Sequence, residues 1–309
     1  MNLTGTDVNK NTVDLPQPLS IVINQEEKTP ADDIVMVFGG GVFPQDIIEF
    51  VLYENQTLIF KGIADVIKTE VTAEGVHTVV EGRSLCGRLL DNEAMPTVYN
   101  YPCESIIFNE YAKKFGVIKS DDSDEVYRGR FAVEKGVAMW QVAENFCKNL
   151  FGTTPRLDET GVLHMRGMPI NQTLVFADDG QGTAYNKLTE TKKISGLVSS
   201  VIARADYGSG YIMRFDNEFA QNKGAVAVRY LDASNEKTPI ACADKILEQS
   251  NSGYYGMVIE APLFVASSLG ASVVVKNKFL GQIEGLVVTK VKASITGKTE
   301  KTVLTLKKV

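Results

Sequence analysis

Few residues of this 309-residue chain have the types and spacing that chemistry requires. The two histidines, His77 and His164, are far apart, and each lies in a predicted strand. A single histidine in a strand is usually structural, so we expect neither to be catalytic. The chain has no His-x-x-x-His or Cys-x-x-Cys pattern and no Gly-x-Ser-x-Gly nucleophile motif. The sequence therefore predicts no catalytic residue, no metal site and no cofactor.

Carboxylates give two weaker hypotheses. Glu134, Glu144 and Asp158 could include the acid–base pair of a glycosidase. The acidic segment 120–125 could hold a calcium ion, but it lacks the central glycine and distal glutamate of an EF-hand loop, which favours a solvated loop. The chain has 38 acidic residues, so such groups arise readily, and no substrate groove is evident around the three carboxylates.

The most informative motif joins a predicted strand to a predicted helix. Residues 76–81 (Val-His-Thr-Val-Val-Glu) have the composition of a strand, and Gly82-Arg83-Ser84 then turns the chain. Residues 85–94 follow, with leucines at helical spacing. Ser84 is the expected N-cap of this helix, because its hydroxyl can accept a hydrogen bond from a free backbone N–H.

Arg83 and Arg88 are the strongest candidates for functional polar residues in this motif. Arg83 has two interpretations. Its guanidinium can pair with a nearby acid within the subunit, or it can fix a contact between subunits. An arginine fork is suited to both, since it binds carboxylates and carbonyl oxygens bidentately.

Composition narrows the class of protein. Hydrophobic residues make up 44% and charged residues 23%, as in ordinary globular proteins, and the net charge is −6. Sequence-specific nucleic-acid binders usually present a basic surface, so the net charge disfavours that class. An acidic channel wall could still let DNA slide past, because it repels the phosphates. The N-terminal segment lacks the features of a signal peptide, and no apolar run is long enough to span a bilayer. We therefore expect synthesis in a cytoplasm, no membrane anchor, and four cysteines that act as small buried hydrophobes.

Three regions separate by pattern: residues 1–92, mainly β; 93–169, an α/β insert; and 170–309, mainly β with one helix. The insert is expected to contain helices at 104–115 and 136–151, with Trp140 in its core, and a hairpin at 157–166. The remaining expected elements are strands at 19–24, 33–38, 47–53, 57–68, 76–81, 196–205, 211–216, 225–231, 256–261, 271–276, 282–296 and 301–306, and a helix at 240–249. The predicted fold is mainly β (α+β), with two antiparallel β-barrel domains separated by the insert.

Several predicted strands are apolar on both faces, and residues 34–38 (Ile-Val-Met-Val-Phe) are the clearest case. Residues 47–53 instead predict alternation, with Ile48, Phe50 and Leu52 on one face. A small antiparallel barrel needs only one buried face. The apolar residues on the second face of these strands therefore predict a contact with another subunit.

Three segments resemble the Mu-type phage tail and baseplate hub family of contractile tails. These segments are Gly82-Arg83-Ser84 with Leu90-Asp91, the Trp140 helix followed by residues 158–163, and the C-terminal helix, turn at Gly270 and final hairpin. The motif residues Gly82, Arg83, Ser84, Leu90 and Asp91 are therefore the candidate family motif and possible interface.

The resemblance implies a structural protein without enzymatic activity. It implies a homotrimeric ring in which two barrels per subunit give pseudo-sixfold symmetry, so that a hexameric tail tube meets a trimeric spike. Spike, tail tube and baseplate wedge proteins would be its partners, DNA could pass passively through the ring, and the chain would reside in the tail of a phage, prophage or phage-tail-like bacteriocin.

Two other classes remain open. One is a tail-associated cell-wall hydrolase. The other is a module that binds cell-surface glycans, for which Tyr99, Tyr101, Tyr254 and Tyr255 are the candidate exposed aromatics.

Overall fold

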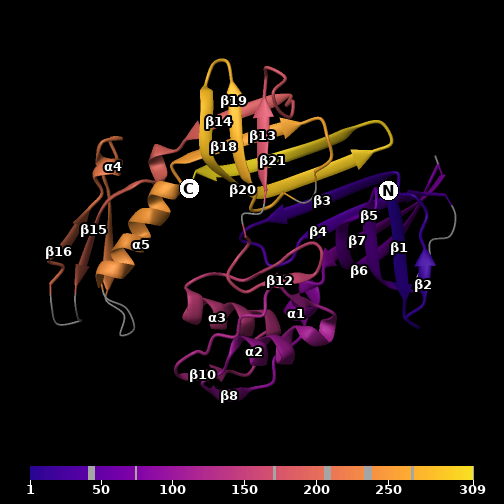
Figure 1. Cartoon of the computed structure of the whole chain (residues 1–309), viewed down its shortest axis with the longest axis horizontal. Coiled ribbons are helices and arrows are strands. Elements are labelled where there is room, and N and C mark those ends of the chain that lie inside the picture. Colours follow the sequence, from indigo (N-terminus) through magenta and orange to yellow (C-terminus); the bar gives the residue numbers. More distant parts are fainter. Residues whose placement is uncertain are drawn as a thin grey trace. The chain divides into compact units, whose positions relative to one another are not determined.

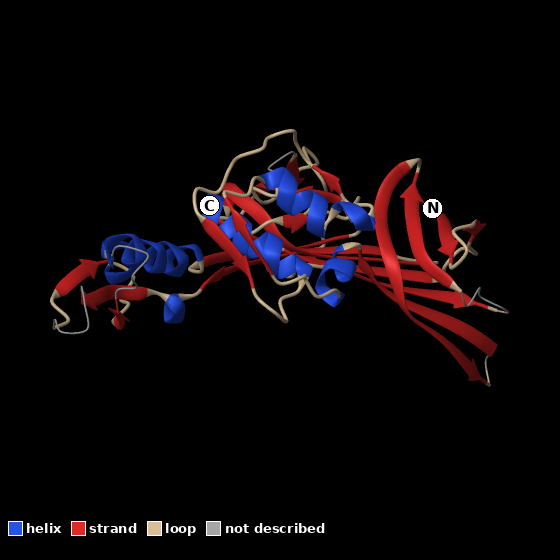
Figure 2. Cartoon of the chain, turned by 90° about the horizontal axis from the view of Figure 1, so that it is seen from below, coloured by secondary structure: helices blue, strands red, loops and turns tan. Residues whose placement is uncertain are grey.

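The computed structural model describes residues 1–40, 46–73, 75–169, 172–204, 210–232, 239–265 and 268–308. Strands account for 50% of the chain and helices for 17%, which confirms the mainly β prediction (Figure 2). The chain divides into two compact units. The first unit comprises Met1–Thr173, Pro262–Ala271 and Thr289–Val303, and the second comprises Leu174–Ala261, Ser272–Val288 and Leu304–Val309.

An antiparallel sheet forms the base of the first unit, in the order β20-β3-β4-β7-β6-β5-β1-β2 (Figure 1). Among the described residues the strand order does not return from β2 to the other end of the sheet, so the sheet does not close into a barrel. Its strands are β1 (Asn2–Asp7), β2 (Thr12–Asp14), β3 (Ser20–Glu26), β4 (Asp33–Gly39), β5 (Ile47–Glu54), β6 (Thr57–Thr72), β7 (Gly75–Ser84) and β20 (Gly281–Thr296), of which the part from Thr289 belongs to this unit.

Alternation along β4 separates two faces of this sheet. Ile34, Met36 and Phe38 are buried, whereas Val35 and Val37 are only half-buried. The register places Val22 of β3 opposite Val35, and Val37 opposite Val79 of β7. These four residues, Val22, Val35, Val37 and Val79, form a half-buried apolar row that we call the valine stripe.

A β-bulge changes the predicted alternation of β5. Ile47 is buried and Ile48 is exposed, so the prediction that Ile48 shares a buried face with Phe50 and Leu52 is wrong. The register between β1 and β5 shifts after Thr6, where Asp7 pairs with Ile47 rather than with Ile48. The extra residue in the bulge turns Ile48 outward.

The longest strand of this sheet extends beyond one of its neighbours. β6 pairs with β5 over Thr57–Ile63, and with β7 as far as Thr72. In the part of the chain that the structure describes, the half of β6 after Ile63 therefore pairs on one side only.

Helices and short strands follow β7 and complete the first unit. They are α1 (Cys86–Asp91), β8 (Thr97–Asn100), α2 (Glu104–Tyr111), a 3-10 helix η1 (Lys113–Phe115), β9 (Ile118–Lys119), β10 (Arg130–Val133), α3 (Met139–Phe151), β11 (Arg156–Leu157) and β12 (Val162–His164). Trp140 is buried with Ala143 and Cys147 on the predicted stripe of α3, and Gly152 ends the helix in the left-handed conformation. β11 and β12 form the predicted hairpin, and β12 also pairs in parallel with β9.

Strands dominate the second unit as well. Its described elements are β13 (Thr173–Ala177), β14 (Lys187–Lys192), a 3-10 helix η2 (Ile194–Gly196), β15 (Val198–Arg204), β16 (Met213–Asp216), α4 (Glu218–Gln221), β17 (Ala227–Asp232), α5 (Pro239–Ser252), β18 (Tyr255–Ala261), β19 (Ser272–Asn277), the part of β20 up to Val288, and the part of β21 (Glu300–Lys308) from Leu304. β14 pairs with β18, and β19 with β20, both antiparallel.

A separate three-stranded sheet in the second unit has the order β16-β15-β17. β15 and β16 form the predicted antiparallel pair, and the connecting residues 205–209 lie outside the described residues. β17 runs parallel to β15, a pairing that the two-barrel prediction did not include. α5 packs on this sheet through Ala243, Ile246 and Leu247.

Candidate functional site

The Gly82-Arg83-Ser84 motif lies at the end of β7, where the chain turns into α1. A Cβ atom on Gly82 would lie 2.4 Å from the carbonyl oxygen of Ile63 and 2.8 Å from Cε1 of Phe50. Backbone and ring therefore leave no room for a side chain here. The glycine is required because β6 and β7 approach closely around a buried aromatic residue.

Arg83 links two strands and a helix. Its Nε and Nη2 donate to the carboxylate of Asp65 at 2.7 and 2.9 Å, and its Nη1 and Nη2 donate to Asp91 at 3.1 and 2.7 Å. Asp65 lies in a bulge of β6, since the register with β7 shifts between Ala64 and Val66. Arg83 thus pairs with acids inside the subunit, in agreement with the first of its two interpretations. The inter-subunit role remains a prediction.

Electrostatics keeps this cluster charged. Hydrogen bonds from Arg83 hold the pKa of Asp91 below its usual range, and those to Asp65 and Asp91 raise the pKa of Arg83. The side chains are 28% (Arg83), 27% (Asp65) and 55% (Asp91) exposed. Solvent screening at such exposure limits the contribution of each ion pair to the stability of the fold. The main effect of these ion pairs is therefore to fix the positions of β6, β7 and α1 relative to one another.

Ser84 does not cap the helix. The N-cap residue of α1 is Leu85, without a side-chain hydrogen bond. Ser84 is fully buried in β7, and its Oγ accepts a hydrogen bond of 3.1 Å from the backbone N–H of Asp32. Its own N–H donates to the Asp32 carbonyl at 2.9 Å. The N-cap prediction is therefore wrong, because the strand continues through Ser84 and a neighbouring segment binds its hydroxyl.

The rest of the motif also serves local packing. Leu90 packs against the buried cluster that the insert shares with Ile63 of β6, and Asp91 ends α1. Arg88 pairs with Glu49 of β5 at 2.6 Å. Of the five motif residues, the structure brings Arg83 and Asp91 into direct contact, whereas Gly82, Ser84 and Leu90 contact other parts of the fold. It adds Asp65 and Glu49 as partners of Arg83 and Arg88, which sequence reasoning missed because a bulge and a strand register set their positions.

We expect Gly82→Ala to destabilise the first unit by about 2–4 kcal/mol, since the new Cβ must displace backbone of β6. Urea unfolding would measure the loss. Gly196→Ala is the matched control, because a Cβ there meets nothing within 4 Å. Equal stability of the two variants would contradict the close approach at Gly82.

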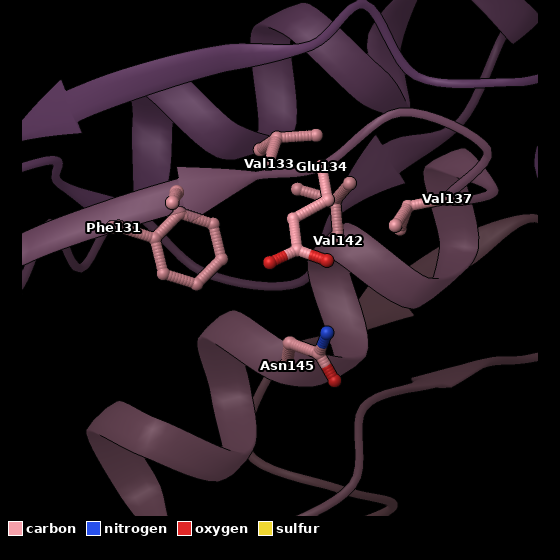
Figure 3. Close-up of a pocket in the computed structure, with 7 residues that line it drawn as sticks. Phe131, Val133, Glu134, Val137, Val142 and Asn145 are labelled. Atoms are coloured by element: carbon pink, nitrogen blue, oxygen red, sulfur yellow. The ribbon is translucent and has the colours of Figure 1, made fainter.

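The three carboxylates of the glycosidase hypothesis do not line one cavity. Glu134 lines a cavity of about 300 Å³ beside β10 and α3, where Figure 3 shows its carboxylate facing the carboxamide of Asn145. Glu144 instead accepts hydrogen bonds from Lys148 and Gln141. Asp158 is paired with His164 at 2.9 Å. A glycosidase requires two carboxylates that flank one bond, and the lining of this cavity supplies one.

His164 and the acidic segment have structural partners. Burial opposes ionisation of Asp158, but hydrogen bonds from His164, Val162 and Thr160 hold its pKa below the usual range, which ties the β11–β12 turn together. Beside the acidic segment, buried Glu104 accepts a hydrogen bond of 2.8 Å from Arg166 and pairs with Lys119 at 3.5 Å. Among the described residues no group of three or more ligating side chains could hold a metal ion.

The four tyrosines of the glycan hypothesis are divided between the two units. Tyr99 shares a hydrogen bond of 2.9 Å with Tyr111, while Tyr101 is 67% exposed. Tyr254 stacks edge-on against Phe219, and it belongs with Tyr255 to the other unit. None of the four cysteines forms a disulfide; Cys86 and Cys147 are buried as predicted, whereas Cys103 and Cys242 are half-buried. No helix in the described residues is long and apolar enough to cross a membrane.

No family model matches the chain, and no curated protein matches its sequence. Solved structures do match its fold along nearly the whole length. A tail protein from Neisseria meningitidis MC58 has a TM-score of 0.73 at 15% identity, covering 99% of this chain and 96% of its own. The 43 kDa tail protein of prophage MuSo2 from Shewanella oneidensis has a TM-score of 0.75 at 13% identity, covering 99% and 97%.

The fold is therefore that of phage tail proteins. Within that class, the likeness to a Mu-type prophage tail protein confirms, at the level of the fold, the resemblance found in the sequence. A component of the type VI secretion system of E. coli, described as similar to the phage T4 tail proteins gp27 and gp5, shares the fold more distantly, with a TM-score of 0.57 at 10% identity over 94% of this chain and 74% of its own.

Proposed function

We propose that this protein is a structural subunit of a contractile tail, the hub of its baseplate, and that it acts by assembly rather than by catalysis. The fold likeness over the full length of two tail proteins is the observation that carries this proposal. Three copies would form a ring, in which two barrel-like β regions per subunit, 1–92 and 170–309, flank the insert 93–169.

The proposed ring would connect a sixfold-symmetric partner to a threefold-symmetric one. Two similar β regions in each of three subunits present six near-equivalent surfaces to a hexameric tail tube, while the ring itself keeps the threefold symmetry of a spike. Spike, tube and baseplate wedge proteins are the proposed partners, and the tail of a phage, prophage or bacteriocin particle is the proposed location. Solved neighbours from Francisella PdpA-VgrG complexes are consistent with partners of the spike kind.

The valine stripe supports an interface between copies. Val22, Val35, Val37 and Val79 lie on the face of the sheet opposite the buried core and remain half-buried in the single chain. Obligate interfaces bury more than about 2,000 Å² and are enriched in apolar residues. A second copy that covers the stripe would complete the burial that its residue types favour.

Analytical ultracentrifugation with and without the spike protein tests the proposal. We expect a species of three times the 33.8 kDa subunit mass, stabilised by the spike. A strict monomer at high concentration in the presence of the spike would overturn it. Zymography on peptidoglycan tests the absence of catalysis, since lysis that depends on one Glu or Asp would replace the hub by a hydrolase.

Arg83→Ala separates the two roles of the motif arginine. If Arg83 lies at a subunit contact, the variant loses trimer affinity by about tenfold or more, while monomer stability falls by less than about 1 kcal/mol. Lys68→Ala is the control, because Lys68 also forms an exposed ion pair on the same sheet, with Glu81. Equal effects on assembly and on folding would return Arg83 to a purely intramolecular role.

A further inference from the structure

A small cavity in the first unit combines apolar walls with one carboxylate. It has a volume of about 300 Å³ and lies beside β10 and α3 (Figure 3). Phe131, Val133 and Val142 are the buried apolar residues of its lining, and Val137 is half-buried. Glu134, which directly follows β10, is exposed. An apolar interior thus lies next to a charged side chain that solvent and ligands can reach.

The carboxylate of Glu134 is not engaged within the chain. Among the described residues it forms no hydrogen bond and no ion pair. Asn145, whose carboxamide faces it, is held by Gln141, since Gln141 Nε2 donates to Asn145 Oδ1 at 2.9 Å. Lys148 on the same helix pairs with Glu144 at 2.8 Å. Glu134 therefore carries the one charge of the described cavity lining, and that charge is available to a ligand.

These surroundings suit a ligand with an aliphatic stem and a cationic head. A lysine side chain has this form, because its four methylenes can lie on apolar side chains while its ammonium remains in water. With Glu134 exposed, the ammonium can pair with the carboxylate without the desolvation penalty of a buried ion pair. The volume is at the lower end of the range for ligand pockets, which suits a single side chain.

We propose that this cavity binds a lysine side chain of a partner protein, with the stem on Val133, Val137 and Val142 and the ammonium on Glu134. The choice of a protein as the source of the lysine rests on the proposed function, because a subunit that acts by assembly meets other chains. Glu134 thus has a binding role in place of the catalytic role that the glycosidase hypothesis gave it.

Other side chains match the cavity less well. An acidic side chain would be repelled by the charge of Glu134, and a neutral apolar side chain would leave that charge unused. Arginine has a shorter stem of three methylenes, and its planar head carries five donors in a fixed fork that a point-like ammonium does not need to satisfy. Lysine therefore makes the fullest use of the valine walls and the single carboxylate.

Methyl NMR on the full chain tests the proposal with a blocked lysine, Nα-acetyl-lysine N-methylamide. The matched probe is the norleucine analogue, which has the same four-carbon stem and no ammonium. We expect both probes to shift the methyl signals of Val133, Val137 and Val142, which line the cavity. The blocked lysine should bind about fivefold more tightly, the size expected for one solvent-exposed, charge-assisted contact.

Glu134→Gln should remove the preference for lysine and leave the affinity for norleucine unchanged. The unchanged norleucine affinity shows that the variant keeps its cavity, so a folding defect cannot imitate the expected result. Glu110→Gln is the matched control, because Glu110 is an exposed carboxylate of α2 in the same unit and does not line this cavity. The control should keep the fivefold preference for lysine.

Equal affinities for the two probes, no shift at the three valines, or a preference that persists in Glu134→Gln would overturn the proposal. So would tighter binding of blocked arginine, which would assign a guanidinium. Binding of n-butylammonium without binding of blocked lysine would assign a free amine in place of a protein. Sedimentation is read separately: a trimer without lysine binding refutes this inference alone, whereas lysine binding by a strict monomer refutes the hub alone.

Discussion

Replacing Arg156 by methionine is expected to destabilise the first unit by about 3–5 kcal/mol, the largest loss we expect from a single polar substitution. Arg156 is 4% exposed, and it binds Asp32 and three backbone carbonyls. Methionine fills a similar volume but offers no donor. The substitution leaves Asp32 as a buried charge without its counterion and removes a hydrogen-bond donor from the carbonyl oxygens of Glu26, Thr29 and Pro30.

Fluorescence of Trp140 during urea unfolding would measure this loss, because Trp140 is the only tryptophan and lies in the buried cluster of the first unit. Arg130→Met is the matched control, since Arg130 is exposed on β10, and its stability should stay within about 0.5 kcal/mol of wild type. A comparable loss in both variants would mean that the effect reflects methionine rather than the buried cluster.

Phe146→Ala is expected to cost about 3–5 kcal/mol through the cavity that it leaves. Phe146 of α3 is 0% exposed, and its ring meets Phe131 edge-on, with centroids 5.7 Å apart. Tyr127 contacts both rings. Removing the central ring takes away packing that neither neighbour can replace without moving its backbone.

The same unfolding experiment measures this change, with Phe279→Ala as control because Phe279 is 83% exposed. We expect the control to unfold like wild type. A loss below about 1 kcal/mol for Phe146→Ala would show that the insert can collapse around the missing ring, and that its core is less closely packed than the ring contacts indicate.

Pattern in the sequence predicted most elements well, because hydrophobic periodicity determines them locally. The α3 helix begins at Met139 and ends at Phe151, with Trp140 buried in the core, close to the predicted 136–151. β1, β2, β8, β9, β10, β13 and β14 were not predicted. In β1, Asn2 and Gly5 disfavour a strand, and pairing with β5 rather than local propensity forms it.

The candidate site was predicted in part. The motif residues lie together because they are close in sequence, whereas the partners of Arg83 and Arg156 depend on the three-dimensional pairing. Asp65 reaches Arg83 through a bulge, and Asp32 is 124 positions from Arg156. No local pattern encodes either contact, so a single sequence could not reveal them. Ser84 illustrates the same limit. Serine is a favoured N-cap residue, but here the backbone N–H of Asp32, which is distant in sequence, donates to its hydroxyl.

The half of β6 that follows Ile63 has a consequence for the newly made chain. In the described residues this half of β6 pairs with β7 and not with β5, so its other edge can template another strand, and Val71 on it is 77% exposed. Lys68 and Glu70 interrupt that segment with charge, which discourages the stacking of like chains. These charges thereby guard a newly made chain in a crowded cell against aggregation through this edge.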